Sequence, residues 1–258
     1  MLEFETLLVD ADGPVGHITL NRPEKLNALS RTVLAELTQA ARALDDVPEV
    51  RVVVVGGAGR AFCAGADLAD FAAMATGGVA DPHAASDAGR RMADAIEAMR
   101  AVTVACVQGR CVGGGVVLAG ACDLRVAAAY AIFSIPEVDL GIPLAWGGIP
   151  RLVRDIGPVR TKDLVLTCRE FAPDEALAAG FLTRVVAPQE LEAAVQSLAA
   201  SLAAKARLPL AATKAHVNAV TDGMVQPGRA FADAAGLIAS LGDPESLEAA
   251  ARYRERLG

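Results

Sequence analysis

The feature that most constrains this chain is a run of three glycines between two apolar segments. Residues 102–107 predict a buried strand, and the glycines at 113–115 open an apolar segment that predicts a helix. Glycine lets the backbone approach another backbone, or a ligand, where a side chain would clash. The first N–H groups of a helix lack intrahelical partners and carry the positive end of its dipole. The turn therefore suits either tight packing alone or the binding of a negatively charged oxygen.

A second glycine-punctuated turn, residues 56–68, follows another apolar segment. That segment, residues 50–55, is short, continuous and rich in valine, which predicts a strand buried on both faces. Because strands and helices alternate through this part of the chain, the pattern favours an α/β core. Two such turns that face each other would offer two N–H groups to one oxygen, which is the arrangement of an oxyanion hole.

The remaining pattern divides the chain into a core and a helical C-terminal region. Segments 7–9 and 15–20 predict two strands around a turn, and Ser30 is a helix N-cap before an apolar helical face. Further on, the pattern predicts a helix over 84–101, short strands over 124–126 and 131–133, loops over 74–82 and 134–143, and helices over 190–204, 208–221 and 230–241. We therefore expect an α/β core over 1–189 and a helical region over 190–258.

Composition and charge exclude several classes of partner. The net charge of −7 disfavours a general nucleic-acid binder or a binder of anionic membranes. No apolar run reaches the roughly 18 residues of a membrane span, and the acidic N-terminus does not resemble a signal peptide. The five cysteines lie mostly in apolar surroundings, which favours reduced core thiols in a cytoplasmic protein. The three histidines are far apart in sequence, so we expect no metal site.

Two residues stand out as candidates for chemistry. Glu137 is a carboxylate between apolar neighbours. If its side chain points into an apolar pocket, desolvation raises its pKa and allows it to accept and donate a proton near neutral pH; the alternative is a solvated loop glutamate. Trp146, the only tryptophan, is either a core residue or the wall of a pocket.

Taken together, these segments resemble the crotonase superfamily, and within it the enoyl-CoA hydratase/isomerase family. The resemblance runs from about residue 9 to about residue 213. Each motif is weak alone, but their order and spacing together are specific. The motifs are residues 18–23 with 26–29, 60–68, 112–115 with 122–124, and 135–138 with 140–141.

The resemblance implies a spiral of ββα units, followed by helices that mediate assembly into a homotrimer or a dimer of trimers. It also implies an acyl-CoA substrate in fatty acid metabolism and no separate cofactor, since coenzyme A is part of the substrate. The N–H groups of Ala66 and Gly114 would hold the thioester oxygen. The substrate and its coenzyme A would be lined by Lys25, Leu26, Ala64, Asp67, Leu68, Gly113, Val117 and Trp146.

The departures from the family pattern bear on the reaction. Family hydratases use two glutamates, and here Val117 stands at the first position while Glu137 stands at the second. The glycine-rich run that helps to hold the catalytic water reads Leu144-Ala145-Trp146 in this chain. We therefore expect a shift of a double bond from Δ3 to Δ2, with Glu137 as the sole acid and base.

Several alternatives to this isomerase remain open. They are a slow enoyl-CoA hydratase, another enolate reaction such as decarboxylation, and a non-catalytic acyl-CoA binder. Asp139 is either a replacement acid or, as the pattern favours, a structural loop residue. No Ser/His/Asp set at usable positions supports a hydrolase.

Overall fold

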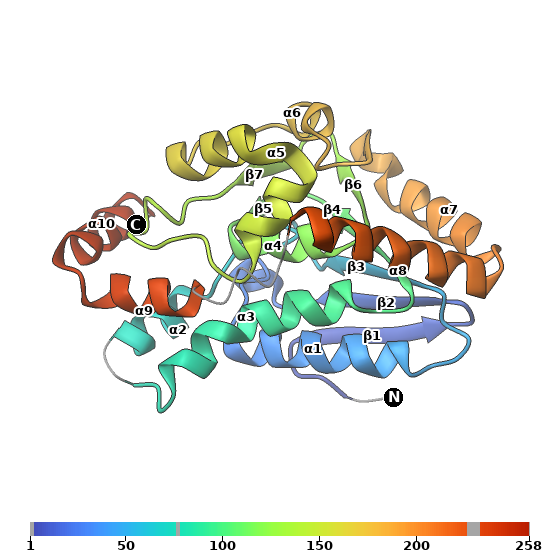
Figure 1. Ribbon diagram of the computed structural model, residues 1–258, viewed down its shortest axis with the longest axis horizontal. Coiled ribbons are helices and arrows are strands. Elements are labelled where there is room, and N and C mark those ends of the chain that lie inside the picture. Colours follow the sequence, from blue (N-terminus) through green and yellow to red (C-terminus); the bar gives the residue numbers. More distant parts are fainter. Residues whose placement is uncertain (1–2, 76–77, 226–232, 258) are drawn as a thin grey trace.

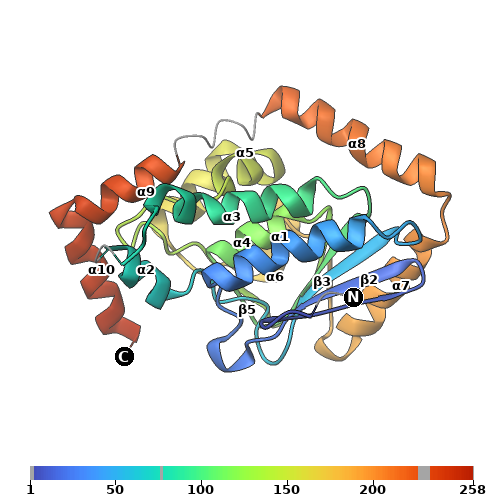
Figure 2. The same cartoon turned by 90° about the horizontal axis from the view of Figure 1, so that it is seen from below.

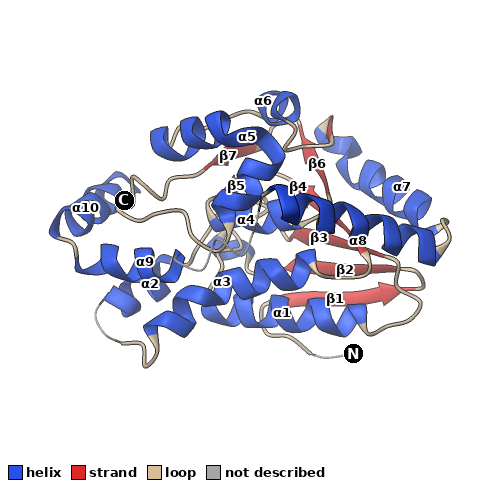
Figure 3. Ribbon diagram, viewed as in Figure 1, coloured by secondary structure: helices blue, strands red, loops and turns tan. Residues whose placement is uncertain are grey.

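The computed structural model describes residues 3–75, 78–225 and 233–257, and it places a six-stranded sheet between two layers of helices (Figures 1 and 3). The strand order is β1-β2-β3-β4-β6-β8, in which β1 and β2 are antiparallel and all other neighbours are parallel; β5 and β7 form a separate parallel pair. The α/β class expected from the sequence is confirmed. The strands are β1 (Leu7–Asp12), β2 (Val15–Leu20), β3 (Val52–Gly57), β4 (Val102–Val107), β5 (Arg110–Val112), β6 (Leu124–Ala128), β7 (Ile132–Ser134) and β8 (Arg184–Val186).

Helices flank both faces of this sheet. They are α1 (Arg31–Asp45), α2 (Leu68–Ala75), α3 (Pro82–Glu97), α4 (Gly114–Ala121), α5 (Gly148–Thr167), α6 (Pro173–Ala179), α7 (Leu191–Ala203), α8 (Arg207–Met224), α9 (Asp233–Gly242) and α10 (Pro244–Leu257). A 3-10 turn at Pro23–Lys25 lies between β2 and α1, and another at Pro188–Glu190 lies between β8 and α7.

Strand β3 shows how the sheet divides the core in two. Val53 and Val55 face the larger apolar cluster with α1 and α3, whereas Val52 and Val54 face a smaller cluster with α7. The prediction of a strand buried on both faces is therefore confirmed. Helix α7 follows the predicted boundary at residue 189, yet it packs on the sheet itself; the division into two regions stays a prediction.

Helix α1 begins and packs as its sequence predicts. The Ser30 hydroxyl accepts a hydrogen bond from the Val33 N–H at 3.3 Å, which satisfies one of the donors that a helix leaves unpaired at its start. The expected apolar face is buried, and it consists of Val33, Leu34, Leu37, Ala41 and Leu44.

The segment after the first glycine-rich turn differs from expectation. Helix α2 occupies residues 68–75, so the predicted loop over 74–82 is shorter; residues 76 and 77 lie outside the described part of the chain. Helix α3 starts one residue after Asp81, whose carboxylate accepts from the Ala84 N–H at 2.9 Å, and it ends at Glu97 rather than at 101. The Ala/Met-rich composition favours a helix here, but it does not mark the ends.

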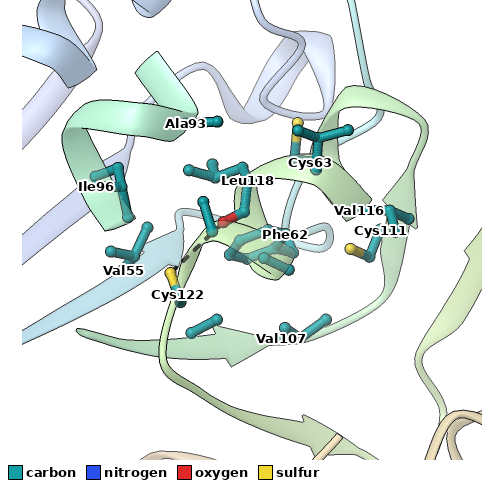
Figure 4. Close-up of a cluster of buried hydrophobic side chains, with 14 of the residues drawn as sticks. Val55, Phe62, Cys63, Ala93, Ile96, Val107, Cys111, Val116, Leu118 and Cys122 are labelled. Atoms are coloured by element: carbon teal, nitrogen blue, oxygen red, sulfur yellow. Dashed lines mark hydrogen bonds between the residues drawn. The ribbon is translucent and has the colours of Figure 1, made fainter. Parts of the chain in front are cut away.

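The three-glycine turn rests on a densely packed apolar base. Between the predicted strand and helix the chain inserts the short strand β5, so the glycines open α4 after β5 and not directly after β4. Every residue of α4 is buried. Figure 4 shows side chains around this helix, among them Phe62, Val107 and Leu118, each 0% exposed. Such packing density leaves little room for the turn to move.

The C-terminal helices lie at opposite ends of the molecule. Helix α8 lies along one side, while α9 and α10 return to α2 and α3 at the other end (Figure 2). The sequence predicted a helical region over 190–258 and gave bounds for α7, α8 and α9 but none for α10; residues 230–232 of the predicted 230–241 helix lie outside the described part of the chain. The basic residues Arg252, Arg254 and Arg256 are exposed on α10.

Candidate active site

The two glycine-rich turns meet, which is the condition that the sequence analysis set for an oxyanion hole. The backbones of Cys63 and Cys111 form an isolated parallel β-bridge, in which the Cys63 N–H donates to the Arg110 carbonyl at 3.0 Å. Gly65 has φ +93°, a backbone conformation that favours glycine. A β-carbon on Gly65 would lie 2.9 Å from the Val112 carbonyl oxygen and 3.6 Å from the Gly114 nitrogen. The segments that carry Ala66 and Gly114 are therefore side by side.

Both predicted oxyanion donors have N–H groups without a hydrogen-bond partner among the described residues. The bridge between Leu29 and Ala66 uses the neighbours of Ala66, because the Leu29 N–H donates to the Gly65 carbonyl at 2.8 Å and the Asp67 N–H donates to the Leu29 carbonyl at 3.1 Å. This pairing turns the Ala66 N–H away from Leu29. The Gly114 N–H is the first of α4 and so has no intrahelical acceptor. Two free donors on adjacent segments fit an oxyanion hole, which stays a prediction.

Strands β5 and β7 bring Glu137 to the same place. They pair in register from Arg110 and Ile132 onward, and the Gly113 N–H donates to the Ser134 carbonyl at 2.9 Å. The loop after β7 then turns back over the glycines. A β-carbon on Gly113, which has φ +51°, would overlap Oε1 of Glu137. Glycine at 113 is thus required both by its backbone angle and by the carboxylate that lies against it.

The Glu137 carboxyl is buried, and one of its two oxygens has no hydrogen-bond partner among the described residues. The residue is 9% exposed, and the oxygen without a partner there is Oε2. Burial raises its pKa to about 7, against an ordinary value of 4.5; its own backbone N–H opposes the shift only in part. A carboxyl with this pKa exchanges a proton readily near neutral pH. The apolar environment that the sequence analysis made a condition is therefore present.

No carboxylate stands where family hydratases have their first glutamate. Val117 is 3% exposed and packs in apolar surroundings. A β-carbon on Gly148 would lie 2.9 Å from both Leu144 Cδ2 and Val117 Cγ2, so these three residues are in close contact. Hydrocarbon side chains therefore occupy the position of the first family glutamate.

Asp139 does not replace the missing acid. Its side chain is 44% exposed and forms an ion pair with Arg256 of α10 at 3.4 Å. The interpretation of Asp139 as a structural loop residue agrees with this contact. Helix α10 also brings Tyr253 toward the site, since burial raises the pKa of this phenol and the Glu137 and Asp139 carboxylates add to the shift. The sequence gave no signal for this approach of the C-terminal helix.

Trp146 lies in contact with the predicted oxyanion hole. Its φ is +61°, which costs a non-glycine residue about 1–2 kcal/mol, so the surrounding contacts must hold it there. A β-carbon on Gly114 would overlap Cζ3 of the indole, and one on Gly89 of α3 would overlap Cδ2. Trp146 fits both predicted alternatives, core residue and pocket wall. Its half-buried indole packs on two helices and also lines a cavity of about 40 Å³.

The residues predicted to line coenzyme A lie along one outer path. The Ala64 N–H donates to the Leu26 carbonyl at 2.9 Å, which joins the loop of Lys25 to the second glycine-rich turn. Lys25 is exposed, and Leu68 is 41% exposed. Asp67 is already paired with Arg22 at 3.0 Å. The structure thus brings these residues together, while their contact with coenzyme A stays a prediction.

Two residues of this region, Asn27 and Gly89, were given no role by the sequence analysis. Asn27 is 1% exposed, and its side-chain amide donates to the carbonyls of Ala58 and Ala61, which fixes the second glycine-rich turn. Gly89 makes room for the indole, and a glycine inside a helical pattern is the signal that would have singled it out. Leu144, which lies against Val117, belongs to the run 144–146 that departs from the glycine-rich family pattern, although its contact with Val117 was not foreseen.

The described residues contain no group of three or more His, Cys, Asp or Glu side chains placed to hold a metal ion. None of the helices described is long and apolar enough to cross a bilayer. All five cysteines are free, and burial raises the pKa of the Cys63 thiol to about 12, which makes it a poor nucleophile.

Comparisons with known proteins agree with this geometry. A family model described as enoyl-CoA hydratase/isomerase matches residues 10–257. The chain is 36% identical over 235 residues to a probable enoyl-CoA hydratase of Mycobacterium bovis, covering 89% of this chain and 90% of that protein. It is 36% identical over 226 residues to the peroxisomal Delta(3,5)-Delta(2,4)-dienoyl-CoA isomerase of Arabidopsis thaliana, covering 82% and 80%. A crystal structure of an enoyl-CoA hydratase from Mycobacterium avium subsp. paratuberculosis matches with a TM-score of 0.88 at 30% identity, over 97% of this chain and 100% of that one.

Proposed function

Because the chain belongs to the enoyl-CoA hydratase/isomerase family, we propose that it moves the double bond of an enoyl-CoA thioester from Δ3 to Δ2, with Glu137 as its only acid and base. The family and the crotonase-like fold expected from the sequence are confirmed by these comparisons. The observation that carries the finer proposal is the pairing of a buried, proton-exchanging Glu137 with the apolar Val117. Relatives of both kinds, hydratases and an isomerase, leave the choice of reaction to the site itself.

The proposed mechanism moves one proton from the α carbon to the γ carbon of the substrate and involves no redox step. The thioester oxygen accepts hydrogen bonds from the Ala66 and Gly114 N–H groups. Ionised Glu137 removes a proton from the α carbon, and the negative charge spreads onto the thioester oxygen as an enolate. The same carboxyl, now protonated, returns the proton to the γ carbon, which leaves the double bond in conjugation. Two fixed donors matter because removing one typically costs about 3 kcal/mol of transition-state stabilisation.

Val117 is the reason to favour isomerisation over hydration. Water addition requires one group to hold and deprotonate the water and another to protonate the α carbon. The side chains of Val117 and Leu144 offer neither a hydrogen bond nor a proton, and they exclude water from the enolate. A slow hydratase that uses Glu137 alone is the second candidate, and the similarity to hydratases is the observation that favours it.

The test compares two substrates and two variants. We expect the wild-type protein to convert a trans-3-enoyl-CoA to a conjugated product of unchanged mass, and to add no water to a trans-2-enoyl-CoA. The variant Glu137→Gln should lose at least about a thousandfold in turnover. The matched control is Glu170→Gln, since Glu170 is an exposed carboxylate paired with Arg110 at the surface. Rapid hydration, or full activity of Glu137→Gln, would contradict the proposal; saturable binding without turnover would indicate a binding protein.

We also propose that the chain assembles as a homotrimer or a dimer of trimers. Helix α8 has no buried residue in the single chain. Its exposed apolar side chains include Leu208 (78% exposed), Val217 (55%) and Met224 (77%). Val217, Val220 (51% exposed) and Met224 follow each other at three and four residues and so share one face of α8. Exposed apolar surface of this kind marks an interaction site, and the family resemblance supplies the partner as further copies of the same chain.

A further inference from the structure

The indole of Trp146 occupies a slot that only glycines leave open. A β-carbon on Gly89 would overlap Cδ2 of the ring, and a β-carbon on Gly114 would overlap Cζ3. The ring therefore lies against the backbones of α3 and α4 at the same time. Gly89 is in the interior of α3, where glycine is an unfavourable choice for a helix, so its contact with the indole gives it a reason to be there.

The backbone that carries the indole is held as firmly as the ring. Trp146 and Gly147 both have positive φ, of +61° and +70°. The Gly147 N–H donates to Oδ2 of Asp233 in α9 at 2.8 Å, and the Gly147 carbonyl accepts from the Arg151 guanidinium at 3.2 Å. Contacts from α9 and α5 thus fix this turn from two directions. The indole is therefore a fixed wall of the site.

This wall closes a small cavity next to the predicted oxyanion hole. Ala66 and Trp146 both line the cavity, with apolar side chains beside them and polar ones at its border; the apolar ones include Leu29, Ala85 and Leu237, and the polar ones are Arg31, Asp67, Asp70 and Ser86. Its volume is about 40 Å³. A water-sized group requires roughly 10–15 Å³ on this measure, so the cavity has room for about three such groups. An acyl chain whose carbonyl oxygen lies between the Ala66 and Gly114 N–H groups would meet the indole within its first few carbons.

We propose that Trp146 determines the chain-length specificity of this site, and that its indole restricts efficient turnover to short-chain enoyl-CoA thioesters by ending the acyl pocket beside Ala66 and Gly114. The inference rests on the proposed function, since it takes the acyl-CoA substrate from there. Each further methylene that finds no room forgoes roughly a fourfold gain in binding. Removal of the indole restores that room, whereas its replacement by another aromatic ring largely does not.

The test measures kcat/KM for trans-3-enoyl-CoA thioesters of six, eight, twelve and sixteen carbons. Trp146→Ala should raise the ratio of the twelve-carbon to the six-carbon value at least tenfold over wild type, and Trp146→Phe should stay near the wild-type ratio. The matched control is Tyr130→Ala, which removes an aromatic side chain that is 50% exposed on the surface. A ratio in folded Trp146→Ala within twofold of wild type would overturn the inference.

A second measurement needs neither a variant nor turnover. Trp146 is the only tryptophan, so the emission of the wild-type protein reports on this wall alone. Saturated butyryl-CoA should change the emission on binding, free coenzyme A should change it less, and dodecanoyl-CoA should bind at least tenfold more weakly than butyryl-CoA. Equal affinity for the two thioesters, or saturable binding without a change in emission, overturns the chain-length inference alone. Failure to bind any acyl-CoA overturns the proposed function as well.

Discussion

At the scale of single residues, Glu137 places catalysis and stability in opposition. In the folded protein burial raises its pKa to about 7, whereas its ordinary value is 4.5. Between these two pH values the folded state holds a proton that the unfolded chain has released, so the free energy of unfolding falls as the pH rises. Above pH 7 the loss is complete and amounts to about 3 kcal/mol.

A substitution at Glu137 should therefore stabilise the protein only at high pH. Glutamine has the shape of the protonated acid and does not titrate, so Glu137→Gln avoids the cost of a buried charge. We expect its melting temperature at pH 8 to exceed that of wild type by roughly 6–12 °C, and the two to agree near pH 4.5. Thermal unfolding followed by circular dichroism at both pH values measures this difference. Equal melting temperatures at pH 8 would show that the carboxyl is not buried as a charge.

The same pKa predicts a pH profile for the reaction. The base must be ionised to remove the first proton, so kcat/KM should rise about tenfold per pH unit below pH 7 and level off above it. Initial rates with a trans-3-enoyl-CoA between pH 4 and 9 measure the profile. An inflection near 4.5 would indicate a solvated carboxylate, and a flat profile would indicate that proton removal by Glu137 does not limit the rate.

Single residues also mark where sequence reasoning stops. Glu137 and Val117 could be assigned because each lies at a fixed distance from a motif in the chain. The position of Trp146 could not, since it depends on a left-handed backbone angle and on contact with Gly89, 57 positions earlier. Packing between distant segments leaves only faint traces in one sequence, here a glycine inside a helix.

At the scale of elements, the first turn of α4 carries the site because its glycines have no side chains and its surroundings leave no room for any. Gly113 and Gly114 expose backbone to a substrate, while a side chain on either would overlap Glu137 or Trp146. The sequence predicted this turn from its glycines, but not the short strand β5 that precedes it. The three residues of β5 pair with β7 and, at Cys111, bridge to Cys63, and so short a strand has no periodicity that could be recognised.

The crowding of α4 can be tested with one methyl group. Gly114→Ala should displace the indole, reduce turnover at least tenfold and cost about 1–3 kcal/mol of stability. Gly120→Ala, in the same helix, is the matched control, because its β-carbon would meet only Phe181 Cε2 at 3.7 Å. Steady-state kinetics and urea unfolding of both variants give the comparison. Adding Trp146→Ala to Gly114→Ala should recover part of the lost stability, and identical behaviour of the two alanine variants would contradict the crowded turn.

At the scale of the whole molecule, the sheet could be predicted from the sequence more fully than the packing of the C-terminal helices. Five of the six strands of the sheet were predictable, β3 and β4 from their apolar runs, and β3 is buried on both faces by covering helices; the short edge strand β8 was not predicted. The return of α10 to the active site was not predictable, since its contacts, such as that between Ser246 and Gly141, join residues more than a hundred positions apart. Nor does the sequence alone say which apolar face of a helix meets another copy of the chain.

Helix α8 provides the test of assembly. One side of this helix is anchored to the body by Lys214, whose ammonium lies 2.7 Å from the Asp123 carboxylate and donates to the Ala101 carbonyl at 2.9 Å. Val217 and Val220, three residues apart and hence on one face, are 55% and 51% exposed. An interface there would bury both, so two carboxylates at these positions would have to be desolvated on association.

We expect the wild-type protein to have the mass of three or six copies of the 26.5 kDa chain in light scattering, and the double variant Val217→Asp/Val220→Asp to have the mass of one copy. The control is Leu8→Asp, which places a charge at an apolar residue that is 54% exposed on the edge strand β1 and should leave the mass unchanged. Circular dichroism shows whether the double variant keeps its helices. A wild-type protein that is monomeric, or a folded double variant that keeps the wild-type mass, would contradict assembly through this face of α8, because buried aspartates could not be accommodated there without loss of the contact.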